Sequence, residues 1–268
     1  GQGTDVVYNN IPTRIYSGVA SVVFTCRAVT TNGELIEWGK LMEDDPCVPH
    51  SVRDQVTKAD ATLYLTQAGE LYTMPETDNV ALGDAYVQSG ELVLSGVRDF
   101  AVGYTYFALK EDGSVWTFQV NSMTAEITEK PKKLIDDVKE ICTGASASSA
   151  ALFLKTDGTL WSCGDNEYGQ CGNGEHGDLD PTTTDCVVSK PYQLAENVTD
   201  VWTTDTTTFY LTEDNDLYAC GQNYNDILLL GGNGQMNLDD YPAYAATPVL
   251  VMENVRQINN KGDMMFVV

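Results

Sequence analysis

Pro131-Lys-Lys-Leu134-Ile-Asp-Asp-Val138-Lys-Glu-Ile141 is one of six copies of a single pattern that runs through the chain. The pattern is a proline, an apolar residue three positions on, a valine four positions later and a second apolar residue three positions further. The valines are Val19, Val56, Val97, Val138, Val198 and Val255, and Gly90 replaces the proline in the third copy. Successive valines lie 37 to 60 residues apart, a spacing typical of propellers, solenoids and arrays. The sequence therefore predicts a repeat fold.

Tight turns behind the first five valines indicate that the repeated unit is made of β-strands. These turns are Asn32-Gly33, Ala68-Gly69, Asp112-Gly113, Asp157-Gly158 and Asp214-Asn215. Asn-Gly and Asp-Gly favour the positive backbone angles of hairpin turns. The runs Phe107–Leu109, Ala150–Leu154 and Phe209–Leu211 are apolar with little alternation, as expected where both faces of a small sheet are packed. We predict an all-β fold, a β-propeller with about six blades, and the pattern allows five to seven.

The predicted propeller occupies residues 1–268 as a single domain. The sixth copy stops at Met264-Met-Phe-Val-Val268, before its hairpin. The segment Asp5–Asn9 precedes the first copy and is predicted to pair beside the C-terminal strands. Such pairing would close the ring, because closure removes the exposed edges of sheets. The alternative is that the chain is a fragment of a longer protein.

The net charge of −24, with only 15 lysines and arginines, excludes nucleic acid as a partner, because binding phosphates requires basic patches. The charge could serve solubility alone, or it could attract a basic or cation-rich partner. No apolar stretch reaches the roughly 18–20 residues of a membrane span, so no membrane insertion is predicted. The polar N-terminus lacks the pattern of a signal peptide, as the N-terminus of a trimmed, secreted chain also would.

The seven cysteines lack the paired spacing of zinc sites, so no structural metal is predicted. Cys163 and Cys220 stand at the hairpin register of Trp38, Met74 and Phe118, which predicts that both are small core hydrophobes. Cys171 and Cys186 bracket an insertion loop. They are expected either to form a disulfide, if the protein is exported, or to remain free thiols.

The segment Leu152–Gly174 resembles the repeat of the regulator of chromosome condensation family. It contains Lys155-Thr-Asp-Gly158, a strand that ends in Cys163-Gly164, and then Asn166-Glu-Tyr-Gly-Gln-Cys-Gly172. The resemblance covers nearly the whole chain and is strongest in residues 131–234. The histidine that usually follows the family's repeat glycine is absent, and Tyr106 stands there in the third repeat. The resemblance implies a propeller that engages another protein. The eukaryotic founder is a nucleotide exchange factor for a small GTPase and binds chromatin.

Side chains in or beside the predicted turns are the candidates for binding a partner: Tyr104, Tyr106, Tyr168 and Tyr224. Trp202 is expected to pack between blades instead. Asp178, Asp180 and Asp185 are weak candidates for calcium, which prefers six to eight oxygen ligands. A solvated acidic loop is the alternative for these three, and no other metal or cofactor is predicted. The glycines of Gly172–Gly177 are interpreted as turn formers rather than a phosphate loop.

No catalytic motif is present, and the chain has only two histidines, His50 and His176. We therefore predict that the protein is not an enzyme but an interaction module. It is expected to bind a protein partner, outside or on the surface of a bacterial cell, with a cytoplasmic location as the alternative. The second hypothesis is a propeller that binds or cleaves carbohydrate with carboxylates at its central opening.

Overall fold

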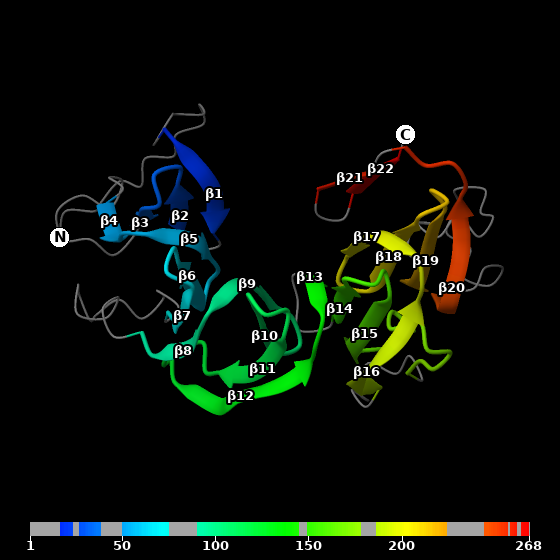
Figure 1. The fold of residues 1–268 in the computed structure, drawn as a ribbon, viewed down its shortest axis with the longest axis horizontal. Helices are drawn as coiled ribbons and strands as arrows, with labels where there is room; N and C mark the ends of the chain where they lie inside the picture. Colours follow the sequence, from blue (N-terminus) through cyan, green and yellow to red (C-terminus); the bar gives the residue numbers. More distant parts are fainter. Residues whose placement is uncertain are drawn as a thin grey trace, which may run out of the picture. The chain divides into compact units, whose positions relative to one another are not determined.

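The computed structural model describes residues 17–23, 27–38, 50–74, 90–144, 149–177, 186–223, 244–256, 258–261 and 264–267. Every regular element in these ranges is a β-strand, and none of the described residues is helical. The chain forms two compact units, residues 1–92 with 121–126 and residues 93–120 with 127–268. Each unit is described by itself (Figure 1).

The first unit holds two sheets whose strands follow one another in chain order. One sheet is β1 (Val19–Val23), β2 (Arg27–Thr30), β3 (Leu35–Glu37) and β4 (His50–Arg53). The other is β5 (Val56–Ala59), β6 (Leu63–Thr66), β7 (Glu70–Thr73) and β8 (Leu92–Ser95). The division between the two units falls inside β8.

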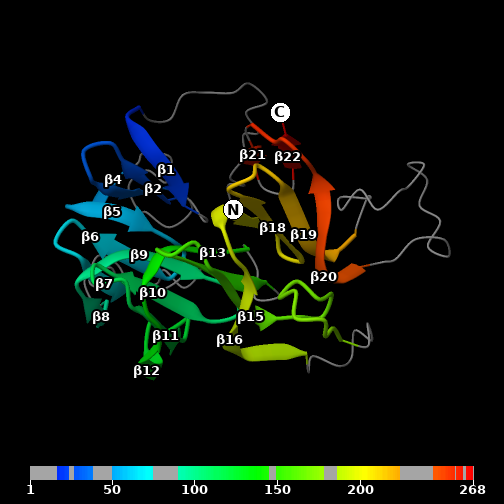
Figure 2. The same ribbon diagram turned by 45° about the vertical axis from the view of Figure 1, so that its right-hand side comes forward.

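The second unit repeats the same arrangement three times, as Figures 1 and 2 show for β17 to β20. Its sheets are β9 (Val97–Val102), β10 (Tyr106–Lys110), β11 (Val115–Val120) and β12 (Ile127–Ile135); β13 (Val138–Thr143), β14 (Ala150–Lys155), β15 (Leu160–Asp165) and β16 (Val187–Ala195); and β17 (Val198–Thr203), β18 (Thr207–Thr212), β19 (Leu217–Gln222) and β20 (Tyr244–Met252). A two-stranded sheet of β21 (Ile258–Lys261) and β22 (Met264–Val267) follows.

Five four-stranded sheets and one partial sheet confirm the predicted all-β propeller architecture of about six blades. The predicted ring closure depends on Asp5–Asn9, which lie outside the described residues, so closure stays a prediction. The single-domain organisation is also still a prediction.

The proline–valine pattern spans the junction between two sheets. Pro131 and Leu134 lie on β12, the last strand of one sheet, whereas Val138 begins β13, the first strand of the next. The N–H of Val138 donates to the carbonyl of Gly113 in the preceding hairpin turn at 2.9 Å. The same bond joins Val56 to Gly33, Val198 to Gly158 and Val255 to Asn215, at 2.8 to 2.9 Å. The proline–valine pattern therefore marks the segment that attaches one sheet to the sheet before it.

The residue before each of the six valines has a left-handed backbone. These residues are Gly18, Gln55, Gly96, Asp137, Asn197 and Asn254, with φ between 57° and 76°. Glycine, asparagine and aspartate tolerate this conformation best, and they fill five of the six positions. In all five four-stranded sheets the pairing register then shifts just after the valine, as in a β-bulge. The sequence analysis missed this signal, although it is visible in the residue types.

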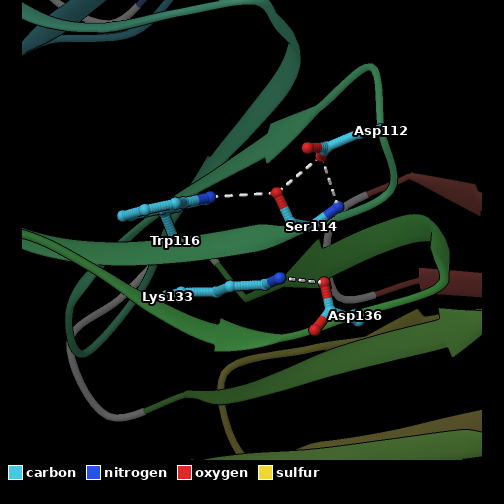
Figure 3. Close-up of polar contacts among 5 residues, drawn as sticks. All are labelled: Asp112, Ser114, Trp116, Lys133 and Asp136. Atoms are coloured by element: carbon cyan, nitrogen blue, oxygen red, sulfur yellow. Dashed lines mark hydrogen bonds and ion pairs between the residues drawn. The ribbon is translucent and has the colours of Figure 1, made fainter.

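The hairpin turns of two neighbouring blades contain the same side-chain contacts, and Figure 3 shows them for the first of the two. Asp112 accepts hydrogen bonds from the backbone N–H and hydroxyl of Ser114 at 2.9 and 2.6 Å, and Trp116 Nε1 donates to the same hydroxyl at 2.9 Å. Asp157, Thr159 and Trp161 repeat these contacts. Lys110 lies over the ring of Trp116 and Lys155 over that of Trp161. These contacts explain the sequence Lys-x-Asp-Gly-Ser/Thr-x-Trp in both blades.

The core lies between successive sheets. One cluster contains Phe107, Phe153 and Cys163, and another contains Phe209, Leu217 and Val255, against which Trp202 packs. Cys163 and Cys220 are fully buried, which confirms their predicted place in the core. Burial raises the pKa of each of these two thiols to about 12, so both stay protonated at neutral pH. Cys171 and Cys186 are free thiols, so the disulfide alternative is not realised in this structure.

Candidate interaction surface

The loop that joins β15 to β16 is held in shape by buried amide side chains. Asn166 accepts a hydrogen bond from the backbone N–H of Cys171 at 2.8 Å and donates to the carbonyl of Glu175 at 2.9 Å. Gln170 donates to the carboxylate of Asp165 at 2.7 Å. Asn166 and Gln170 are both fully buried. Satisfied polar groups of this kind fix one loop conformation.

This loop also attaches its sheet to the following one, through β20. The N–H of Gly174 donates to the carbonyl of Ala246 at 2.9 Å. A Cβ on Gly169 would lie 2.4 Å from Cα of Ala246, and a Cβ on Gly172 would meet Leu194, Cys220 and Pro248. The glycines are therefore needed where the loop touches the next sheet. This agrees with their interpretation as turn formers.

Two of the predicted binding tyrosines lie against the core of the second unit. Tyr104 is half-buried, and its hydroxyl lies 3.7 Å from Sγ of Cys163. Burial is the main reason that the pKa of Tyr104 lies well above its usual value. Tyr106 is half-buried and stacks on Phe118 with ring centroids 5.6 Å apart. Both tyrosines lie in or beside the turn between β9 and β10, as predicted, and each ring is partly covered by the core. Their binding role stays a prediction.

The other predicted site residues divide into one that is described and four that are not. Tyr168 is half-buried in the loop after β15, where its N–H donates to Oε1 of Gln170 at 2.9 Å. Tyr224 and the calcium candidates Asp178, Asp180 and Asp185 lie outside the described residues. The sequence analysis missed a pair of aromatic side chains near this loop, His176 and Tyr244. Their rings are in contact, and the hydroxyl of Tyr244 lies 2.8 Å from Nε2 of His176.

Carboxylates recur on the first strands of the second unit. Asp99, Glu140 and Asp200 each stand two positions after a repeat valine, on β9, β13 and β17. The middle strand, β13, contacts both β9 and β17. Glu140 and Asp200 are exposed at the surface, but both carboxylates are partly desolvated. Partial desolvation raises the pKa of Glu140, and the charge of Asp200 raises it further, whereas Lys139 lowers it. Partial desolvation also raises the pKa of Asp200. The sequence could not select these residues from 39 acidic ones.

Replacing Asp200 with asparagine is expected to lower the pKa of Glu140, because it removes a neighbouring negative charge. A raised carboxyl pKa in the folded state means that ionisation above that pKa destabilises the fold, and this penalty disappears as the pH falls through it. Asp200→Asn should therefore raise stability slightly at pH 7 and have no such effect near pH 3. NMR titration of the Glu140 side chain measures the shift. Lys139→Met is the opposite control and should raise the same pKa.

Within the described ranges, no group of three or more histidine, cysteine, aspartate or glutamate side chains is arranged to hold a metal ion. The same ranges contain no helix long and apolar enough to cross a membrane.

Two family models match the part of the chain that carries these loops. Both describe the Regulator of chromosome condensation (RCC1) repeat, over residues 138–170 and 157–204. Residues 138–204 are therefore similar to RCC1 repeats. These residues run from β13 to β17 and contain the buried Asn166 and Gln170. They also contain the glycines that touch β20. No curated protein sequence matches the chain at a significant level.

Solved structures extend the RCC1-like fold to most of the chain. Prp20p from Saccharomyces cerevisiae, studied for its binding to Gsp1p and histones, superposes with a TM-score of 0.57 at 17% identity, over 85% of this chain and 61% of that one. Yeast RCC1 bound to Kap60 superposes with a TM-score of 0.57 at 17% identity, over 89% of this chain and 62% of that one. Human WBSCR16 superposes with a TM-score of 0.53 at 17% identity, over 87% of this chain and 66% of that one. The chain thus spans about three fifths to two thirds of these relatives, and it shares with them an RCC1-like β-propeller fold.

Proposed function

We propose that this chain is a non-enzymatic interaction module that binds a positively charged protein partner. The observation that carries the proposal is the net charge of −24 on an RCC1-like propeller fold. The exposed carboxylates of Glu140 and Asp200, on neighbouring strands, are part of that charge. Prp20p, which has the same fold, is described as binding histones, and histones are basic. Complementary charge accelerates association and selects partners more than it adds affinity.

Affinity capture with the purified chain tests this function. Basic proteins should be retained at low salt, and the dissociation constant of the best one should rise at least tenfold between 50 and 300 mM NaCl, because salt screens exposed charges. The double variant Glu140→Gln/Asp200→Asn should bind it more weakly, and a thermal stability no lower than that of the unmodified chain is the control. Retention of no protein at 50 mM NaCl would refute the proposal.

The location of the protein is part of the proposal. Our first choice is the outside or the surface of a bacterial cell, with the cytoplasm as the alternative. Cys163, Cys171, Cys186 and Cys220 are free thiols, the usual state in the cytoplasm, and they support the alternative. Protease added to intact cells should digest the protein only if it is exposed at the surface.

A carbohydrate-active propeller is the second candidate. Glu140 and Asp200 lie on neighbouring strands, and the charge of Asp200 contributes to the raised pKa of Glu140, so the two form an interacting pair of carboxylates of the kind that glycosidases use. Release of reducing sugar from a glycan panel, abolished by Glu140→Gln, would support it. Absence of turnover, together with saturable binding of one protein, would support the interaction module instead.

A further inference from the structure

The exposed apolar residues of the second unit gather on the last strands of two neighbouring sheets. Among the described residues of this unit, the exposed large hydrophobic side chains are Val187 and Tyr192 on β16 and Leu250 and Met252 on β20. Leu250 is 45% exposed and Met252 38%. Leu194 and Pro248, from the same two strands, both lie against Gly172. An apolar surface on otherwise charged protein marks an interaction site.

The strand β20 is also the open edge of its sheet, shown in orange in Figures 1 and 2. The strand order β17-β18-β19-β20 leaves the far side of β20 without a partner strand among the described residues. The loop after β15 reaches only the N-terminal half of β20, where Gly174 bonds to Ala246. Exposed edge strands can accept another strand, because their backbone N–H and C=O groups are unpaired.

The equivalent strand β12 is protected against such pairing. Lys133 pairs with Trp116 across β12 and β11, and Leu250 holds the same position opposite Tyr218 across β20 and β19. Lys130 and Lys132 are exposed beside Lys133. Lysines on an edge strand discourage the addition of another strand. Because β20 has Leu250 where β12 has Lys133, the edge of β20 lacks this protection and can accept an apolar segment.

The charge around this edge is negative. Exposed Glu213 and Asp214, half-buried Asp216 and exposed Glu253 lie in the two turns at the C-terminal end of β20, with Arg256 as the nearby cation. The backbone bond from Val255 to Asn215 joins these two turns. In the part of the chain that is described, none of the four carboxylates is paired with a cation. A second copy of the chain carries the same net charge of −24, so electrostatic repulsion disfavours it as the occupant of this edge.

We propose that the edge of β20 from Val249 to Met252 docks an extended, positively charged segment of a partner protein, which adds to the sheet as a further strand. This proposal rests on the proposed function and places it on one strand. Alternate apolar side chains of the added segment contact Leu250 and Met252, and its basic side chains face the carboxylates of Glu213, Asp214 and Glu253. Backbone bonds supply affinity, and charge selects the partner.

The test uses the full chain and a labelled peptide of alternating lysine and valine, seven residues long, with its glutamate–valine counterpart. Fluorescence anisotropy should show saturable binding of the lysine peptide alone. Hydrogen exchange should slow at the amides of 249–252. Leu250→Lys/Met252→Lys, of which the first change places lysine at the position of Lys133 on β12, should raise the dissociation constant at least tenfold. Thr128→Lys/Glu129→Gln on β12 adds the same two charges and should change it less than twofold.

Several results would overturn the docking site. Equal weakening in both double variants would mean that charge alone attracts the peptide, and equal binding of both peptides would remove the role of the carboxylates. A concentration-dependent dimer that Leu250→Lys/Met252→Lys abolishes would identify a second copy as the occupant. If the lysine peptide does not bind, the site is wrong. Capture of basic proteins that survives Leu250→Lys/Met252→Lys would leave the proposed function intact and refute only this location.

Discussion

Replacing Phe153 with alanine is expected to lower the free energy of unfolding of the second unit by about 4 kcal/mol. Phe153 lies on β14 with no exposed surface, and its ring meets that of Phe107 edge-to-face at 5.5 Å between centroids. The same cluster contains Ile141, Val138 and Cys163, so the ring joins residues from two successive sheets. Its removal leaves a cavity that strands pinned by sheet hydrogen bonds cannot collapse to fill.

Urea denaturation followed by tryptophan fluorescence measures this loss, because Trp161 packs against the same cluster. Phe153→Leu keeps most of the volume and should cost about 1 kcal/mol. A loss below about 1 kcal/mol for Phe153→Ala would mean that the packing between these two sheets contributes little to stability.

The fold was predictable because its signals are local and repeated. The proline–valine pattern recurs six times and a tight turn follows the first five copies, so each copy supports the interpretation of the others. The same register placed Cys163 and Cys220 in the core correctly, since both follow the hairpin turn by an equal number of residues. Only the place of the proline–valine pattern differs from the prediction. It was expected to lie within one blade, and in the structure it spans the junction between two blades.

The surface was less predictable because it depends on contacts between sheets. Tyr104 follows Gly103 in a turn and is predicted to be a candidate for binding a partner. Its ring turns inward because Gly164, on the next sheet, leaves room for it: a Cβ there would lie 2.7 Å from the ring. No local pattern contains that information. The exposure of Leu250 likewise becomes informative only once the strand register shows that it occupies the position that Lys133 holds on β12.

Replacing Gly169 with alanine is the second large effect that we expect. Gly169 has φ of +78°, and a Cβ at this position would lie 2.4 Å from Cα of Ala246 and 2.8 Å from its Cβ. The left-handed backbone costs an alanine about 1–2 kcal/mol, and relieving the overlap with a neighbouring strand adds about 1–3 kcal/mol. We expect a total loss of about 3 kcal/mol or more and a fall in melting temperature of about 10 °C.

Gly174 in the same loop separates the two causes. Its φ of +86° is similar, but a Cβ there would meet only the methyl of Thr247, at 3.8 Å. Gly174→Ala should therefore cost only the backbone strain, about 1 kcal/mol. Differential scanning calorimetry of both variants measures the difference. If the two lose equal stability, the contact of Gly169 with Ala246 does not attach the loop to β20. A larger loss for Gly169→Ala, with β20 amides exchanging faster, would show that the RCC1-type loop joins one sheet to the next.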